Sequence, residues 1–313
     1  MSEDQRVIWM MMPGGDASMI AKSLKYQPDV IIPCVEDGVQ YTPEAKAAAR
    51  QVLIDELGGT RFTDADVLVY PRINHPSGPY WRDDIETVLR TEASGVVIPK
   101  TESAEDVRAV AEQLEAMELA SGRSAAPLRI IAMIETPKGV LRAEDIAAAH
   151  PRVRGVLFGR EDFSAAVGLM RRHEDSLREG SPELLYARGA VVAAAQAVGV
   201  EAIDGAAFTL TDMDYIMKDA SLTARLGFTG KLAAHPAHVK GIRWGFTPTD
   251  EDLQLARQMV AVESHAEESG DAAVAGVAGL EVTPPVVAQA KLLLRRAEWA
   301  EQNAKRGIVS VAQ

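Results

Sequence analysis

Hydrophobic residues along this chain gather in short continuous runs that end in charged or polar residues. The clearest run, residues 130–134, ends in Glu135 and Thr136. A strand without polar alternation is typical of a parallel sheet that helices cover on both faces. Because a buried carboxylate is costly without compensation, Glu135 needs either a partner or exposure at the end of its strand.

The same pattern recurs along the chain, with stretches of helical composition between successive runs. The runs begin near residues 7, 29, 66, 95, 128, 153, 201 and 231. Eight strand–helix units within roughly 240 residues, with polar residues at the strand ends, predict a (β/α)8 TIM barrel. A doubly wound sheet is the alternative, and it is disfavoured because no GxGxxG fingerprint follows the first run.

The C-terminal part of the chain has a different pattern. It predicts helices over 251–268 and 284–306, joined by a connector over 270–279 that is rich in glycine, alanine and valine. We therefore expect two domains: a catalytic barrel over 1–248 and a helical extension over 249–313. Such an extension can cover a site or join subunits.

Composition narrows the possible partners. The 313 residues carry a net charge of -12, so no general positive field attracts nucleic acid or an anionic membrane surface. The single cysteine, Cys34, excludes an intrachain disulfide and a cysteine-based zinc site. The first apolar run is too short for a signal peptide, and no stretch reaches the length of a membrane-spanning helix. We expect a cytoplasmic protein without nucleic-acid or membrane partners.

Two carboxylates, Glu135 and Asp162, follow consecutive predicted strands. Neighbouring strands lie about 4.8 Å apart, so carboxylates at equivalent heights can share one cation. Mg²⁺ or Mn²⁺ needs only one or two protein carboxylates, because substrate and water fill its other positions. The alternative is that both acids form ordinary ion pairs with Arg72 or Arg160.

Other charged residues follow strands at the same end of the predicted barrel. Arg72 offers a bidentate fork for a substrate carboxylate, which suits a small keto acid, and Lys100 can assist it. Both cations can equally well neutralise nearby acids. Glu36 and Asp37 can orient metal-bound water or Arg72, or simply cap the next turn.

The order of the motifs resembles one known family. They read PGG, VEDGV, PRIN, VVIPK, IETPKGV, LFGREDFSAAVG, AIDG and LGFTGKLAAHP. Together, over residues 7–300, they are similar to the citrate lyase β-subunit branch of the HpcH/HpaI aldolases, which includes malyl-CoA and citramalyl-CoA lyases. The resemblance implies a TIM barrel, usually a homotrimer or homohexamer, whose C-terminal helices pack on a neighbouring subunit and help to close its site.

The resemblance also implies roles for individual residues. Glu135 and Asp162 would hold Mg²⁺, with Mn²⁺ as a possible substitute, and Arg72 would hold the keto-acid carboxylate. The acidic pair of the family's second-strand motif falls on Glu36 and Asp37, which would bind the metal's water. The candidates for contacts with an anionic acyl-CoA are Lys22, Lys25 and Lys100.

Three positions depart from the family pattern. Cys34 stands where an aspartate is usual, and Arg160 stands where small residues are commoner, so its cation could bind a second anionic group of the substrate. Thr283 occupies the usual position of a lid aspartate that is a proposed acid or base, with Glu281 nearby. The general base is therefore open between a metal-bound hydroxide oriented by the acidic pair and Glu281 from a neighbouring subunit.

The resulting hypothesis is a Mg²⁺-dependent carbon–carbon lyase acting on a 3-hydroxyacyl-CoA, such as malyl-, methylmalyl- or citramalyl-CoA. The products would be a 2-keto acid and an acyl-CoA. One alternative is a thioester hydrolase that uses the same metal site, and another is a homologue that binds without turnover. A third, an aldolase for free acids, is disfavoured because the aldolase branch has a histidine near the second strand, and none occurs before His75.

Overall fold

The computed structural model describes residues 6–122, 126–169, 181–269 and 276–305. The chain forms two compact units, one ending at Ile242 and the other beginning at Arg243. The predicted connector 270–279 lies partly outside the described residues. None of the helices in the described ranges is long and apolar enough to cross a membrane.

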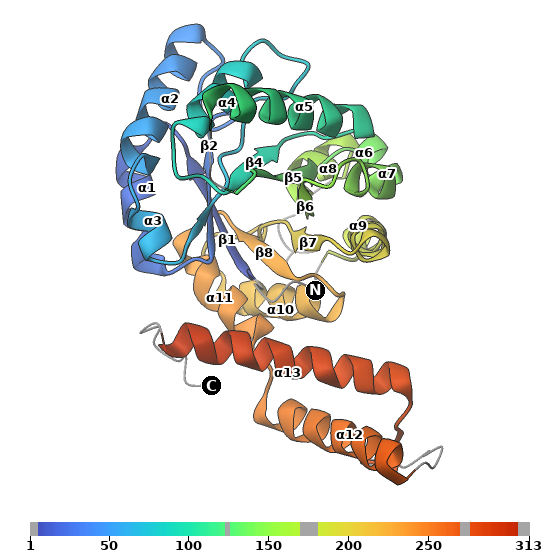
Figure 1. Cartoon of the computed structure of the whole chain (residues 1–313). Coiled ribbons are helices and arrows are strands. Elements are labelled where there is room, and N and C mark those ends of the chain that lie inside the picture. The colour runs from blue at the N-terminus through green and yellow to red at the C-terminus, as the bar shows by residue number, and fades with distance from the viewer. Residues whose placement is uncertain (1–5, 123–125, 170–180, 270–275, 306–313) are drawn as a thin grey trace. The chain divides into compact units, whose positions relative to one another are not determined.

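The first unit contains eight parallel strands in the order β3-β2-β1-β8-β7-β6-β5-β4 (Figure 1). The strands are β1 Ile8–Pro13, β2 Val30–Cys34, β3 Leu68–Val69, β4 Gly95–Ile98, β5 Arg129–Ile134, β6 Val153–Phe158, β7 Glu201–Asp204 and β8 Gly230–Ala233. They correspond to the eight apolar runs, so the prediction of a (β/α)8 barrel is confirmed.

The barrel closes between β3 and β4 through the residues that follow β3. Arg72 forms isolated parallel bridges to Cys34 on one side and to Val97 on the other. The Arg72 N–H donates to Pro33 O at 2.9 Å, and the Ile73 N–H donates to Val97 O at 3.1 Å. With the Ser94 N–H donating to Val69 O at 2.8 Å and the Val97 N–H donating to Pro71 O at 2.9 Å, this last seam is a short run of hydrogen bonds rather than a long ladder.

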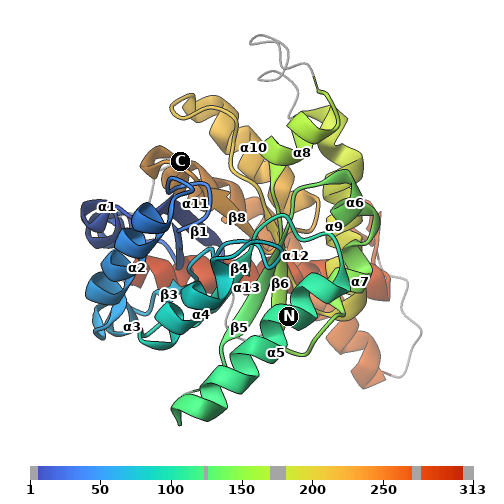
Figure 2. The ribbon, with the colours of Figure 1, turned by 90° about the horizontal axis from the view of Figure 1, so that it is seen from above.

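Helices surround the strands, as the view from above shows (Figure 2). They are α1 Ala17–Ser23, α2 Pro43–Leu57, α3 Arg61–Asp64, α4 Trp81–Leu89, α5 Ala104–Ser121, α6 Pro137–Leu141, α7 Ala143–Ala147, α8 Arg160–Ala166, α9 Leu185–Val198, α10 Met213–Arg225 and α11 Pro236–Phe246. The stretch of helical composition between β5 and β6 is not a single helix. It divides into α6 and α7 at Arg142, whose backbone leaves the helical region at φ -121° and ψ 19°.

The barrel interior is filled by a cluster of buried side chains from seven of its strands and from Tyr70, which follows β3. The cluster consists of Trp9, Val30, Ile32, Tyr70, Val97, Ile131, Met133, Leu157, Ile203 and Leu232. Side chains alternate across a strand, so the residues next to these in sequence face the helices instead. This alternation determines where the charged residues of β7 and β8 lie.

The second unit is a helical hairpin with its own core. Helix α12 Asp250–Ser269 and helix α13 Pro284–Lys305 are joined through the short antiparallel strands β9 Gly276–Val277 and β10 Leu280–Glu281. The turn residues Ala278 and Gly279 both have positive φ, as a two-residue hairpin loop requires. The buried residues of its core cluster are Ala256, Met259, Val282, Val287 and Ala290.

Candidate functional site

Glu135 lies directly after β5 and is completely buried. Its Oε1 accepts the Lys100 N–H at 2.8 Å, whereas no donor among the described residues reaches its Oε2. Burial raises the pKa of Glu135 to about 8, with Arg72 opposing the shift and the nearby Asp162 carboxylate adding to it. A buried carboxylate oxygen without a donor, next to a second carboxylate, is an arrangement that a cation would complete.

The sequence predicted that Asp162 lies at the end of a strand, but the structure places it in a helix. Strand β6 ends at Phe158, and Asp162 is the third residue of α8. Gly159 precedes this helix and lies against Glu135, since a Cβ at Gly159 would be only 2.4 Å from Glu135 Oε2. The glycine therefore allows the first turn of α8 to approach the buried carboxylate.

The carboxylate pair fits the metal expected from the sequence. Within the described ranges, no group of three or more histidine, cysteine, aspartate or glutamate side chains could hold a metal ion. Glu135 and Asp162 supply two oxygen-bearing groups, which is the number that Mg²⁺ uses when water and substrate complete its coordination. The donor set excludes neither Mg²⁺ nor Mn²⁺.

Arg72 is buried beside this pair. Its Nη2 lies 3.0 Å from Glu36 Oε2, and its Nε donates to Cys34 Sγ at 3.1 Å. Burial alone would lower the pKa of Arg72, but the neighbouring Cys34 and acids raise it above its usual value, so the guanidinium is always charged. Cys34, at the position where the family usually has an aspartate, thus holds Arg72 through its sulfur.

Lys100 connects the acidic pair, Glu36 and Asp37, with the metal-site carboxylate Glu135. Its backbone is left-handed, at φ 46°, and its N–H is the donor to Glu135. Its ammonium donates to Glu36 Oε1 and, at 2.9 Å, to Asp37 Oδ2. Burial opposes ionisation of Asp37, but the hydrogen bonds from Lys100 leave its pKa below the usual value. Lys100 thus neutralises the neighbouring acids, and its contact with substrate or acyl-CoA stays a prediction.

A cavity of about 480 Å³ opens beside these groups. Glu36, Asp37 and Lys100 line one part of it, and Tyr41 and His75 line another. The cavity is large enough for a small acid or the acyl end of a thioester, because binding pockets for small molecules begin at about 300 Å³.

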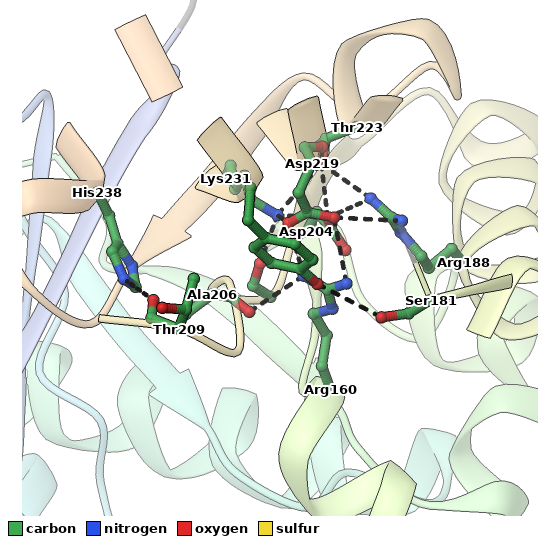
Figure 3. Close-up of polar contacts among 12 residues, drawn as sticks. Arg160, Ser181, Arg188, Asp204, Ala206, Thr209, Asp219, Thr223, Lys231 and His238 are labelled. Carbon is green, nitrogen blue, oxygen red and sulfur yellow. Dashed lines mark hydrogen bonds and ion pairs between the residues drawn. The ribbon is translucent and has the colours of Figure 1, made fainter. Parts of the chain in front are cut away.

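The structure gives Arg160 different partners from those expected. Its side chain is buried, and its guanidinium donates to Asp219 Oδ2 at 2.7 Å and Oδ1 at 3.2 Å (Figure 3). It therefore does not line the cavity described above. The partner comes from α10, and no local signal in the sequence connects the two residues.

The remaining candidates stay predictions. Lys22 and Lys25 are exposed, on α1 and on the short 3₁₀-helix Leu24–Tyr26 that follows it. Glu281 is in β10 and Thr283 follows it, both in the second unit.

The buried Asp204, Asp219 and Lys231 form a second group of charges that the sequence analysis did not recognise. A lysine inside an apolar strand was the available signal, because such a residue needs a buried partner. The group lies around Arg160 and Arg188 (Figure 3).

Comparison with known proteins places these features in context. The chain is 36% identical over 282 residues to the citrate lyase subunit beta-like protein of Deinococcus radiodurans, covering 90% of this chain and 94% of that protein. It is 30% identical over 300 residues to the L-malyl-CoA/beta-methylmalyl-CoA lyase of Cereibacter sphaeroides, covering 91% and 92% of the two chains.

A solved structure matches both the barrel and the sequence. It is the protein CitE from Mycobacterium tuberculosis in complex with magnesium, acetoacetate and coenzyme A, with a TM-score of 0.75 and 28% identity over 95% of this chain and 100% of that one. The profile of the HpcH/HpaI aldolase/citrate lyase family matches residues 7–236. With a matched barrel and relatives aligned over nearly the whole length, the chain belongs to the HpcH/HpaI aldolase/citrate lyase family.

Proposed function

We propose that this protein is a Mg²⁺-dependent carbon–carbon lyase that cleaves or forms a 3-hydroxyacyl-CoA, with a 2-keto acid and an acyl-CoA as the other reactants. The observation that carries the proposal is the buried Glu135 carboxylate, with the half-buried Asp162 next to it and the buried Arg72 beside it. The pair offers a site for a cation, and Arg72 offers a permanent charge for a carboxylate.

The comparisons support this substrate class. The Mycobacterium tuberculosis protein binds magnesium, acetoacetate and coenzyme A together, and the Cereibacter sphaeroides relative is named as a lyase of malyl-CoA and methylmalyl-CoA. Acetoacetate together with coenzyme A, and malyl-CoA by itself, each combine an oxygen-rich acid with a CoA group. The substrate we propose has the same combination.

Each residue of the site has a distinct part in the reaction. Glu135 and Asp162 would hold the metal, which when bound would act as a Lewis acid toward negative charge on the keto oxygen. Arg72 binds the adjacent carboxylate, and its hydrogen bond to Cys34 and ion pair with Glu36 fix the orientation of its fork. The reacting carbon is thereby held in one position relative to both charges, which reduces the entropy cost of reaching the transition state.

The hydroxyl proton must leave when the carbon–carbon bond breaks. Asp37 is the more exposed member of the acidic pair, and its lowered pKa makes it a poor proton acceptor but a good anchor for water. We assign it the role of orienting a hydroxide that accepts the proton and becomes water. The electron pair of the broken carbon–carbon bond passes to the acyl-CoA as an enolate, which then takes a proton back from that water. Glu281, reaching the site from a neighbouring subunit, is the other candidate, and it requires a homotrimer or homohexamer with the second unit as a lid.

The test separates the lyase from its competitors. The purified protein is incubated with Mg²⁺ and malyl-CoA, methylmalyl-CoA or citramalyl-CoA, and keto acid and free CoA are measured separately. Keto acid without stoichiometric free CoA is the expected result. Free CoA without keto acid would instead identify a thioester hydrolase, and keto acid only from the free acids would identify an aldolase.

A further inference from the structure

Five charged side chains form a buried network beside β7 and β8 (Figure 3). The members are Arg160, Arg188, Asp204, Asp219 and Lys231, and each has at most 2% of its surface exposed. Among these five residues there are three cations and two carboxylates. Such a concentration of buried charge is stable only when every ion has close partners of opposite sign.

The network lies on the outer side of the barrel wall. Ile203 and Leu232 belong to the cluster inside the barrel, so their neighbours Asp204 and Lys231 face the surrounding helices. Lys231 Nζ contacts Asp204 Oδ2 at 2.7 Å and Asp219 Oδ2 at 2.8 Å. The network therefore ties two strands of the barrel to α10.

Arg160 reaches this network from the first position of α8. Its side chain crosses Gly205, where a Cβ would lie only 2.4 Å from Arg160 Cγ. Its guanidinium binds both oxygens of Asp219, donates to Ala206 O at 3.2 Å and lies 4.6 Å from the centre of the Phe208 ring. A fork held on both oxygens of one carboxylate fixes direction as well as distance.

Asp162 is two residues further along the same helical turn. Side chains two residues apart on an α-helix point about 200° apart, so Arg160 and Asp162 project to opposite sides of α8. On one side Gly159 lies against Glu135, and on the other Arg160 is fixed to Asp219. The first turn of α8 is thus held between the carboxylate site and the network.

We propose that Arg160 is a positioning residue whose ion pair with Asp219 fixes the first turn of α8 and so holds the Asp162 carboxylate opposite Glu135. The proposal rests on the metal assignment in the proposed function. It explains why an arginine replaces the small residues that are commoner at this position. The guanidinium fixes the helical turn that carries the metal-binding Asp162, and it does not contact substrate. Residues that orient a metal ligand in this way typically change affinity by about 10- to 100-fold when replaced.

The experiment measures metal affinity directly. Binding of Mn²⁺ is followed by electron paramagnetic resonance, with Mg²⁺ as competitor, on the full chain with and without Arg160→Met. The matched control is Arg188→Met, because Arg188 belongs to the same network and binds Asp204 at 2.7 Å but comes from α9. Each replacement removes one of the three buried cations and leaves two carboxylates with two cations.

We expect Arg160→Met to raise the Kd for Mn²⁺ about 10-fold and Arg188→Met to leave it unchanged. Arg160→Lys keeps the charge but loses the fork, so its Kd should lie between wild type and Arg160→Met. Thermal unfolding of each variant shows whether it is folded. If Arg160→Met does not fold, the comparison of Arg160→Lys with Arg188→Lys decides in the same way.

Equal changes in Kd for the Arg160 and Arg188 variants, or no change for either, would overturn the positioning role. The variant Glu135→Gln separates this failure from failure of the metal assignment. If Glu135→Gln abolishes Mn²⁺ binding while Arg160→Met does not weaken it, only the positioning role is wrong. If Glu135→Gln binds Mn²⁺ as wild type does, the metal assignment itself is wrong, and the proposal fails with it.

Discussion

Glu135 after β5 and Asp204 at the end of β7 are both completely buried carboxylates, yet their pKa values shift in opposite directions. Burial raises the pKa of both, but around Asp204 the cations Lys231 and Arg188 more than offset it and leave the pKa well below the usual value. Around Glu135 the single cation Arg72 does not, and the pKa rises to about 8.

The difference lies in how completely each site is compensated by the protein itself. Asp204 Oδ2 contacts Lys231, Arg188 and Thr223, each at 2.7 Å. One oxygen of each carboxylate, Asp204 Oδ1 and Glu135 Oε2, has no hydrogen-bond partner in the described part of the chain, but the other oxygen of Glu135 accepts only the Lys100 N–H. A buried carboxylate whose charge is balanced by neighbouring cations serves stability, whereas one whose charge is not balanced is a candidate for ligand binding.

Replacement of Glu135 by glutamine should have the largest effect on turnover. It keeps the shape of the side chain but removes a metal ligand, so we expect a loss of about 1000-fold in kcat, the scale of removing one preorganised electrostatic group. Without metal and above pH 8, the variant should be as stable as wild type or more stable, because it lacks the buried charge of Glu135. Turnover assays measure the loss of kcat, and thermal unfolding measures the stability of the variant. A large loss of stability would show that Glu135, like Asp204, has a structural role.

Replacement of Asp204 by asparagine should have the reverse profile. Lys231 and Arg188 would lose a shared carboxylate in the interior, and breaking a buried pair costs about 3 kcal/mol of stability. The measurement is urea unfolding monitored by circular dichroism. The folded Asp204→Asn protein should bind metal with nearly the same affinity as wild type. If the variant instead lost metal affinity and kept its stability, Asp204 would be part of the metal site and not of the structural network.

Replacement of Arg72 by lysine tests the carboxylate-binding role. A lysine keeps the charge but cannot present the bidentate fork, so the KM for the keto acid in the condensation direction should rise about 10- to 30-fold. The KM for the acyl-CoA should change much less. Steady-state kinetics with each reactant varied in turn distinguishes this result from a general loss of activity.

The pH dependence of stability should differ between the two carboxylates. Folded Glu135 binds its proton more tightly than the unfolded chain, whose pKa is near 4.5, so its contribution to stability decreases as pH rises from about 4.5 to about 8. The slope from this residue should be at most about 1.4 kcal/mol per pH unit. Asp204 has a lowered pKa, so its contribution is present above pH 3.8 and decreases below it.

Metal provides the control for this pH experiment. Saturating Mg²⁺ holds Glu135 ionised, so it should flatten the decrease between pH 4.5 and 8 while leaving the acid side unchanged. Denaturant unfolding across the pH range, with Mg²⁺ and with EDTA, gives both curves. Identical curves under the two conditions would contradict metal binding at Glu135.

The sequence predicted the barrel because each strand is a separate local signal. Apolar runs identify buried strands wherever they occur, and the strand ends of such a fold meet at one face. Glu135 was found in this way. The motif resemblance then assigned it a metal role beside Asp162.

Other features depended on contacts that local patterns do not contain. Asp162 was expected at a strand end because no local signal marked the helix that begins at Arg160. The Arg160 partner, Asp219, is 59 residues away on another helix, and the Lys100 partners Glu36 and Asp37 are more than 60 residues away. Pairings over such separations are determined by the closed barrel as a whole.

The barrel's closing seam has a consequence for its motion. Arg72 forms the single bridges to β2 and β4 and also carries the guanidinium at the site. Segments held by few hydrogen bonds open most readily, so the amides of Arg72, Ile73 and Val97 should exchange with deuterium sooner than those inside the longer ladder between β5 and β6. A carboxylate bound to Arg72 would stabilise the closed seam, and slower exchange at these three amides would report its binding before any turnover.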